Sequence, residues 1–310
     1  MSTELPTQQP DTPTEQLTPE RITELTHAIA GQLQFDPTDA QLLKFTNNAV
    51  FRLPAAKAVV RIAGSATMTR RVQKVIRVAR WFQHHDVRAV RLLPVDQPIV
   101  VDGLTATLWA EVPNTGPAAT GADLANILTH IHGLPPPPAG LPRWAPLQEI
   151  RQRLDDPEGV SASDVAYLSE QCDQLEEHLA KLEYTLPEGP IHGDAFIGNL
   201  ITAPDGPVIC DFDSSCIGPR EWDLTPLAVG RLRFDYPGDE YGPLTAQYGF
   251  DVITWPGFPT LRRLRELKLV TSLVPVLNSR PTLRAQWQHR FDTFRAGDEA
   301  TRWSAYGAAA

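Results

Sequence analysis

The feature that most constrains this chain is a run of polar residues set between short apolar segments. It reads GPIHGDAFIGNLITAPDGPVICDFDSS and extends from Gly189 to Ser215. Carboxylates beside buried strands are costly unless they are paired or bind a cation. The sequence Ala-Pro-Asp-Gly separates two apolar runs, which predicts a β-hairpin. Such a hairpin would bring Asn199, which precedes it, close to Asp211, which follows it.

The side chains in this segment favour magnesium binding and phosphoryl transfer. Carboxylate and amide oxygens bind Mg²⁺, which takes its remaining ligands from water and phosphate. Asn199 and Asp211 are therefore candidate metal ligands. Asp194, five residues before Asn199, could orient a substrate hydroxyl and accept its proton. Taken singly, each of these residues is better explained as a turn or capping residue, but the ordered set favours the catalytic interpretation.

Composition argues against several other classes of protein. The 310 residues carry a formal net charge of -9, which gives no reason to expect nucleic acid as the main partner. No apolar run approaches the roughly 18 residues that a membrane helix needs. Three cysteines without a CxxC pair favour a reducing, cytoplasmic setting over a disulfide framework or a zinc site.

The first part of the chain predicts a small β-rich lobe. Residues 1–17 are rich in Pro, Thr, Gln and Glu, which is typical of a disordered tail and not of a secretory signal. Residues 18–112 contain a helix, three short β-like runs and a second helical period that begins at Met68. Two more β-like runs follow, joined by Asp102-Gly103 as the turn of a hairpin.

The rest of the chain predicts a larger helical lobe, so the fold class is α+β with two lobes. Pro, Gly, Thr and Ala dominate residues 113–121, which suits a connection at the start of a second domain, 113–310. The strands of the opening segment interrupt this mostly helical part. The expected helices are 122–134, 163–186, 261–277 and 281–296.

The motifs HGDAFIGN, VICDFD and GPREWDL together resemble the catalytic segment of the aminoglycoside phosphotransferase and choline kinase group. These enzymes are relatives of the protein kinases, so the resemblance implies a two-lobed protein-kinase-like fold. It also implies that Asp194 is the catalytic aspartate and that Asn199 and Asp211 bind Mg²⁺. Asp213 is a further, weaker metal candidate. His192 would brace the catalytic loop.

The same resemblance assigns two residues after the metal ligands to structural roles. Asp223, in GPREWDL, is expected to bond to the backbone of the catalytic loop. Trp222 beside it is expected to belong to the core. Neither is expected to take part in the chemistry.

In the small lobe, the resemblance implies an ATP-binding role for several residues. Asn47 and Asn48 lie where the family has a hairpin over the phosphates. Arg61, in the strand AVVRI, stands where lysine is usual. Arginine is always charged and can bind phosphate through two N–H groups, although Arg61 could also be a surface residue of the strand. Glu111 and Val112 lie where the family contacts adenine through its backbone.

The small lobe departs from the family pattern at one position. The lysine of the family usually pairs with a glutamate on the following helix. Residues 40–85 contain nine Lys and Arg residues and no acid, so no alignment supplies that glutamate. Either Arg61 acts without this partner or the lobe positions ATP differently.

Three functions therefore remain open. The leading one is an ATP- and Mg²⁺-dependent kinase that phosphorylates a hydroxyl group of a small molecule, such as an antibiotic-like compound or a metabolite. The alternative is a catalytically weak nucleotide-binding or regulatory pseudokinase, favoured by Arg61 and the missing glutamate. A protein kinase is third, because no glycine lies between Gly31 and Gly64 and no APE-like segment follows DFD.

Charge near the C-terminus bears on the acceptor. A group of acids, Asp235, Asp239 and Glu240, precedes the stretch from Leu261 to Arg290, in which Glu266 is the only acid. The basic residues of that stretch are Arg262, Arg263, Arg265, Lys268, Arg280, Arg284 and Arg290. Polycationic aminoglycosides would be repelled by such a surface, which predicts a neutral or anionic acceptor. The stretch could also be a solvated helix face.

Overall fold

The computed structural model describes residues 19–45, 48–63 and 66–306 and divides the chain into two compact units. The first unit contains the residues up to His84 together with Ala89–Val112. The second contains His85–Arg88 and the chain from Pro113 onward. The predicted tail, 1–17, and the predicted hairpin residue Asn47 lie outside the described residues.

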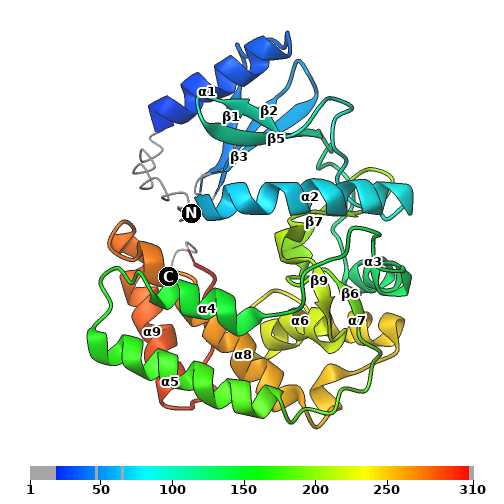
Figure 1. The fold of residues 1–310 in the computed structure, drawn as a ribbon. Coiled ribbons are helices and arrows are strands. Elements are labelled where there is room, and N and C mark those ends of the chain that lie inside the picture. Colours follow the sequence, from blue (N-terminus) through cyan, green and yellow to red (C-terminus); the bar gives the residue numbers. More distant parts are fainter. Residues whose placement is uncertain (1–18, 46–47, 64–65, 307–310) are drawn as a thin grey trace, which may run out of the picture. The chain divides into compact units, whose positions relative to one another are not determined.

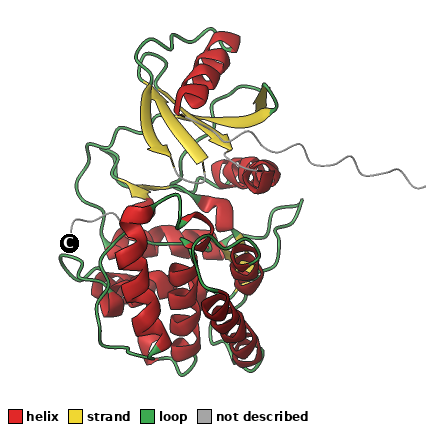
Figure 2. Ribbon diagram, turned by 90° about the vertical axis from the view of Figure 1, so that its left-hand side faces the viewer, coloured by secondary structure: helices red, strands yellow, loops and turns green. Residues whose placement is uncertain are grey.

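A five-stranded antiparallel sheet forms the centre of the first unit (Figures 1 and 2). Its strand order is β1-β2-β3-β5-β4. The predicted hairpin around Asp102-Gly103 is confirmed: both residues have positive φ, at 49° and 76°, and join β4 to β5. The strands are β1 (Gln41–Phe45), β2 (Asn48–Leu53), β3 (Ala58–Ala63), β4 (Ile99–Val101) and β5 (Leu104–Ala110).

Alternating side chains place the two helices of this unit on different faces of the sheet. Val60 and Ile62 of β3 pack with Leu25 and Ile29 of α1 (Pro19–Gln32) in one core cluster. Successive residues of a strand point to opposite faces. Ala63 accordingly packs against α2 (Ala66–His84) in a second cluster, and Arg61 lies on this same face.

The described residues of the second unit are mostly helical (Figures 1 and 2) and include four short strands. Among its described residues, as in the first unit, no helix is long and apolar enough to cross a membrane. Helix α8 packs against α4, α5, α6 and α9. The helices are α3 (Gly121–Gly133), α4 (Pro146–Leu154), α5 (Ala162–Leu179), α6 (Glu221–Arg233), α7 (Tyr241–Tyr248), α8 (Phe258–Thr271) and α9 (Arg284–Arg295). The strands are β6 (Gly189–Ile191), β7 (Leu200–Ile201), β8 (Val208–Ile209) and β9 (Cys216–Gly218).

Two of the expected helices are shorter than the sequence suggested. The helix expected over 163–186 ends at Leu179. Further on, the backbone N–H groups of Thr185 and Leu186 donate to the Glu221 carboxylate at 2.8 and 2.7 Å instead of to helical carbonyls. The helix expected over 261–277 ends at Thr271, before Pro275, whose ring and missing N–H disfavour a helix interior.

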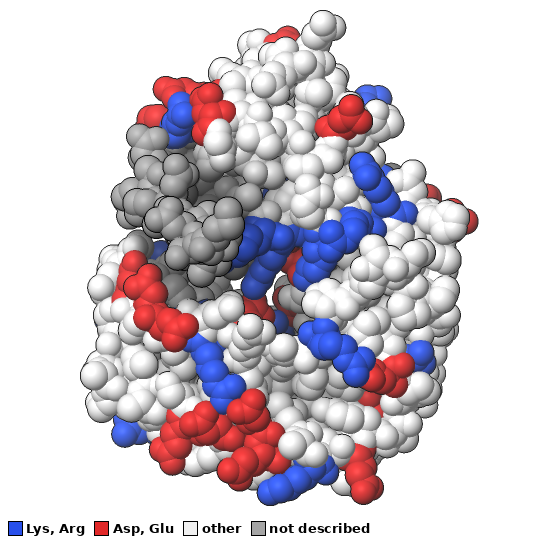
Figure 3. Space-filling model, in the orientation of Figure 1, with Lys and Arg blue, Asp and Glu red and all other residues white. Residues whose placement is uncertain are grey.

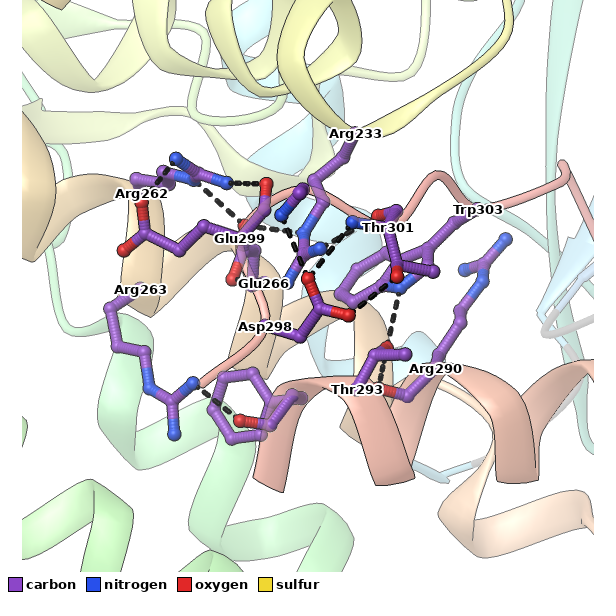
Figure 4. Close-up of polar contacts among 12 residues, drawn as sticks. Arg233, Arg262, Arg263, Glu266, Arg290, Thr293, Asp298, Glu299, Thr301 and Trp303 are labelled. Carbon is purple, nitrogen blue, oxygen red and sulfur yellow. Dashed lines mark hydrogen bonds and ion pairs between the residues drawn. The ribbon is translucent and has the colours of Figure 1, made fainter. Parts of the chain in front are cut away.

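The described C-terminal segment is bound to α6, α8 and α9 by a buried polar network (Figure 4). Arg233 donates to Glu266 at 2.8 Å and to the Thr301 carbonyl at 2.7 Å. The side chains of Arg233 and Glu266 are 1% and 3% exposed. Trp303 is fully buried, and the Arg233 guanidinium lies 4.5 Å from the centroid of its ring. The segment therefore belongs to the core of the second unit.

Asp298 shapes the turn that leads into this segment, and its loss is expected to lower the thermal unfolding midpoint. Its carboxylate accepts hydrogen bonds from the N–H groups of Ala300 and Thr301 and from the Thr301 hydroxyl. These bonds lower the pKa of Asp298 to about 2. The stabilisation is thus present above the ordinary carboxyl pKa and lost as the pH falls through about 2.

The midpoints of the wild type and Asp298→Ala should therefore differ at pH 7, with the wild type higher. They should converge as the pH is lowered from 4 towards 2. Thermal denaturation followed by circular dichroism measures both midpoints. A difference that does not change between pH 7 and pH 2.5 would contradict the assignment.

Candidate functional site

The loop that carries Asp194 is fixed by a buried carboxylate. Asp223, at the start of α6, accepts hydrogen bonds from the N–H groups of His192 and Gly193 at 2.6 and 2.7 Å. Its Oδ2 also lies 3.0 Å from the Nε2 of His132 on α3. Because a carboxylate can only accept, the Nε2–H of His132 donates to Asp223, and the Tyr248 hydroxyl lies 2.7 Å from the other ring nitrogen of His132. The backbone contact expected for Asp223 is present.

His192 and Gly193 determine the direction of the chain at Asp194. The Nδ1 of His192 lies 3.3 Å from the Asp194 N–H and accepts from it, so its Nε2–H donates to the Cys210 carbonyl at 3.1 Å. Gly193 has φ +85°, and a Cβ at this position would lie 2.3 Å from the Ser214 carbonyl oxygen. No other residue type fits this position without distortion.

Trp222 completes the support of the loop. It is buried, as expected of a core residue, and its indole N–H donates to the Gly193 carbonyl at 2.9 Å. The indole therefore satisfies a backbone group of the loop and also fills the core behind it.

The predicted hairpin follows this loop. Strands β7 and β8 pair antiparallel, and the N–H of Gly206 donates to the Ala203 carbonyl across the turn between them. Beyond the paired residues, the Cys210 N–H donates to the Asn199 carbonyl at 2.9 Å. The chain therefore brings Asn199 next to the residue that precedes Asp211.

The donors at the open end of this hairpin fit a hard cation. The Asn199 amide nitrogen donates to the Asp194 carbonyl at 2.8 Å, which leaves the amide oxygen as the group that can bind a metal. Asp211 is exposed and adopts a left-handed conformation, with φ 60° and ψ 46°. Asp213 follows in a 3₁₀ turn, Phe212–Ser214. An amide oxygen and carboxylates are suitable ligands for Mg²⁺.

These donors would not hold a metal alone. Across the described parts of the chain, no group of three or more His, Cys, Asp or Glu side chains could hold a metal ion. Mg²⁺ usually keeps several waters and is bound by one or two carboxylates together with substrate phosphates. The donor set fits a cation that arrives with a nucleotide.

The side chain of Asp194 meets a cation from α8. Arg265 donates to its Oδ1 at 2.5 Å, and the side chain of Arg265 is 10% exposed. Burial by itself would raise the pKa of Asp194. The positive charges of Arg265 and Lys268 outweigh that effect and hold the pKa below its ordinary value. Asp194 is therefore an ionised carboxylate at neutral pH.

The basic stretch around α8 is not a solvated helix face. The side chains of Arg262, Arg265 and Lys268 are 12%, 10% and 11% exposed, and each forms an ion pair. Arg263 donates to the Phe294 carbonyl and to Gln171, and Arg290 is buried. Their long side chains lie in the packed interfaces between helices, where the charged groups form ion pairs or hydrogen bonds.

The acids noted before this stretch are also engaged. Asp239 accepts from the backbone N–H groups of Tyr241 and Gly242. Glu240 accepts from the backbone N–H of Gly121 at 2.7 Å. Only Asp235, 80% exposed, remains largely in solvent.

In the first unit, Arg61 and Asn48 lie on one face of the sheet and can bond to each other. Arg61 pairs with Val50 and Thr107 across the strands, and Asn48 pairs with Ala63. With its amide oxygen turned towards Arg61, Asn48 accepts from the Arg61 Nη2 at 2.7 Å and Nε at 3.2 Å. The amide on β2 thus gives the Arg61 guanidinium a neutral partner, whereas the acidic partner of the family pattern would lie on the following helix, α2.

Glu111 and Val112 end the first unit. The Glu111 carboxylate accepts from Arg52 Nε at 2.6 Å, and its backbone N–H donates to the Lys57 carbonyl at 2.8 Å. The Glu111 side chain is therefore committed to the sheet. Any recognition of adenine here would use other backbone groups of Glu111 and Val112.

The sequence did not identify Arg265, Lys268 or His132 as neighbours of the loop. Arg265 follows Asp194 by 71 residues. The spacing of the charged residues on α8 could have indicated this contact. Arg265 and Lys268 lie four and seven residues after Leu261, on the same helical face as that fully buried leucine. Charged residues on an apolar helix face indicate a buried partner.

Solved structures share this fold. A choline/ethanolamine kinase family protein from Mesorhizobium loti is 18% identical, with 89% of this chain and 93% of that chain covered and a TM-score of 0.61. The amicoumacin kinase hAmiN, in complex with AMP-PNP, Ca²⁺ and Ami, is 12% identical, with coverages of 92% and 97% and a TM-score of 0.66. The choline kinase LicA from Streptococcus pneumoniae is 15% identical, with coverages of 88% and 99% and a TM-score of 0.65.

Sequence comparison gives the family. No curated protein sequence matches the chain significantly. The model of the phosphotransferase enzyme family matches residues 11–267, which is well over half of the chain and includes Asp194, Asn199 and Asp211. The two-lobed, kinase-like α+β fold expected from the sequence is confirmed. The chain belongs to the phosphotransferase enzyme family.

Proposed function

We propose that this protein is an ATP-dependent kinase that phosphorylates a hydroxyl group of a small molecule. The observation that carries the proposal is the way the second unit holds Asp194. Asp223 fixes the loop through the N–H groups of His192 and Gly193, and Asn199 ties it to the hairpin that ends at Asp211. A rigid loop that joins a candidate base to candidate metal ligands suits phosphoryl transfer, where positioning and electrostatics dominate.

Asp194 is the proposed general base. It is ionised, and its carboxylate is 31% exposed, so a substrate hydroxyl can reach it. It would orient that hydroxyl towards the terminal phosphate and accept its proton. His192 acts through the loop, because both of its ring nitrogens are used in hydrogen bonds that hold it.

Asn199 and Asp211 are the proposed ligands of Mg²⁺, with Asp213 as a weaker candidate. When bound, the cation would neutralise charge on the nucleotide phosphates. Arg61, braced by Asn48, is proposed to bind phosphate. Asn47, which lies outside the described residues, keeps its proposed role in the hairpin over the phosphates. Adenine recognition is proposed for the backbone of Glu111 and Val112. Because all three cysteines are free, we propose a cytoplasmic location.

A catalytically weak, nucleotide-binding pseudokinase is the second candidate. Two observations favour it: Arg265 already occupies one oxygen of Asp194, and Arg61 is braced by the neutral amide of Asn48 instead of by a carboxylate on α2. An ATP-consumption screen against hydroxylated metabolites and antibiotics, with Asp194→Ala as the control, separates the candidates. Acceptor-dependent consumption that Asp194→Ala abolishes supports the kinase. Tight, magnesium-dependent ATP binding without transfer to any acceptor supports the pseudokinase.

ATP binding should require magnesium, and Asp211→Ala should weaken it most among the variants of the proposed metal ligands. Asp211 adopts the left-handed conformation, which costs a non-glycine residue about 1–2 kcal/mol. Such strained residues are concentrated at functional sites. Calorimetric titration of ATP with and without Mg²⁺ measures the effect. Asp205→Ala is the matched control, because its side chain is 82% exposed in the hairpin turn. Equal ATP affinity with and without Mg²⁺ would remove Asp211 from the metal site.

A further inference from the structure

Arg265 is a buried guanidinium with unused hydrogen-bond donors beside the proposed base. The residue is 8% exposed and lies in the middle of α8. Its Nη1 donates to Asp194 Oδ1 at 2.5 Å. Within the described chain, its Nε and Nη2 have no hydrogen-bond partner, and neither is fully sealed from solvent. Guanidinium groups bind carboxylate and phosphate through two parallel N–H bonds, so Arg265 can bind a second anion.

The location of Arg265 places such an anion on the acceptor side of Asp194. The main-chain carbonyl of Asp194 bonds to Asn199, the proposed metal ligand. The carboxylate of Asp194 instead meets α8 through Arg265. The proposed phosphate and metal site is therefore connected to the backbone of Asp194. The proposed acceptor hydroxyl must instead approach the carboxylate of Asp194. An anionic group bound by Arg265 would therefore lie beside the acceptor hydroxyl.

The other charges on α8 and its neighbours support an anion here. Lys268, one helical turn after Arg265, lies 3.3 Å from Glu149 of α4. The same Glu149 also pairs with Arg153, at 3.3 Å, so one carboxylate serves two cations. The acids on the exposed face of α5 gather elsewhere on the second unit, in the lower part of Figure 3. They are Glu170, Asp173, Glu176 and Glu177.

A tyrosine lies in the same positive field. Burial raises the pKa of the Tyr236 hydroxyl, and the positive charges of Arg290 and Arg265 oppose that rise. The residue is nevertheless 54% exposed, and its ring stacks on Phe234 with ring centroids 5.1 Å apart.

We propose that Arg265, supported by Lys268, binds an anionic group of the acceptor, so that the substrates are small molecules carrying both a hydroxyl and a carboxylate or phosphate group. This inference rests on the proposed kinase function and narrows its substrate class. The anion would be held by Nε and Nη2 of Arg265 while Nη1 keeps its bond to Asp194. The bound anion would place the hydroxyl against the free part of the Asp194 carboxylate.

The terminal phosphate of ATP offers the same chemistry to Arg265, so the test must separate the two sources. Initial rates are measured with magnesium ATP and matched acceptor pairs that differ in one charge: glycerate and glyceramide, gluconate and gluconamide. The variants are Arg265→Gln and Arg265→Lys. Arg263→Gln is the control on the same helix, because Arg263 bonds to Gln171, Tyr167 and the Phe294 carbonyl instead of to Asp194.

The wild type should prefer the acid of each pair. Arg265→Gln should raise KM for the acids by about 10- to 100-fold, the loss expected for a hydrogen bond between charged groups. It should leave KM for the amides and for ATP within about threefold. Arg265→Lys should recover part of the loss, because it keeps the charge but loses the fork of donors. Should Arg265→Gln fail to fold, Arg265→Lys and the wild-type preference decide the question.

Three results would overturn the inference while leaving the kinase function in place. A wild type that uses the amides as well as the acids, or only the amides, has no anion subsite. Equal losses for acids and amides in Arg265→Gln would make Arg265 a positioning residue for Asp194. If Arg265→Gln raises only the KM for ATP, Arg265 binds the nucleotide and not the acceptor. Absence of transfer to every acceptor of the wider ATP-consumption screen, with magnesium-dependent ATP binding intact, is a different result and would reject the kinase function on which this inference rests.

Discussion

Replacing Asp194 by Asn is expected to reduce phosphoryl transfer by at least ~100-fold while the fold and nucleotide binding persist. Removing a positioned general base costs about 100- to 10,000-fold in rate. Asn has nearly the same shape, and its amide oxygen can still accept from Arg265, which donates to Asp194 at 2.5 Å. The backbone bonds of the loop do not involve this side chain, so Asp223 should hold the loop as before.

Transfer to the best acceptor of the ATP-consumption screen measures this effect, and calorimetry of magnesium ATP tests the binding. Asp205→Asn is the matched control: it makes the same chemical change in the same segment, on a side chain 82% exposed. It should retain wild-type turnover. An Asp194→Asn variant with near wild-type turnover would show that Asp194 is not the base.

The second large effect is expected at Asp223, whose replacement by Ala should destabilise the protein by about 3–5 kcal/mol, the usual cost of removing one partner from a buried charged cluster. The carboxylate is fully buried and accepts from His192, Gly193 and His132. Without it, two backbone N–H groups and an imidazole N–H remain buried without an acceptor, each at a cost of about 1–3 kcal/mol. The loop would also lose its anchor, so transfer should fall as well.

Urea denaturation followed by tryptophan fluorescence measures the free energy of unfolding. Asp173→Ala is the control, because Asp173 is 73% exposed and forms a surface ion pair with Arg151. Such surface changes usually stay within about 0.5 kcal/mol. If both variants unfold at the same urea concentration as the wild type, the buried cluster does not stabilise the second unit.

Local sequence determined the elements whose contacts lie close together along the chain. The hairpin of Leu200–Ile209 follows from two apolar runs around an Ala-Pro-Asp-Gly turn, and the structure contains it. The short β-like runs separated by turn residues likewise predict the strands before Met68, and the helical period after Met68 predicts α2. In each case, turn chemistry or side-chain periodicity acts over a few residues, so the pattern alone specifies the element.

The sequence also identified the candidate site residues, because Asp194, Asn199 and Asp211 lie in one short segment. A hairpin that closes between Asn199 and Cys210 leaves little freedom in how their neighbours meet. The candidate metal ligands could therefore be predicted from sequence spacing. Their roles in binding and catalysis remain proposals.

Only the tertiary structure decided which distant side chains meet this segment. Arg265 lies 71 residues after Asp194, and His132 lies 91 residues before Asp223. A helical pattern shows which residues share a face of α8, but not which element that face packs against. The sequence therefore left Arg265 and Lys268 as members of a basic stretch that could have been solvated. Packing of α8 among its neighbouring helices buries these charges, and the high cost of an unpaired buried charge requires each to have a partner.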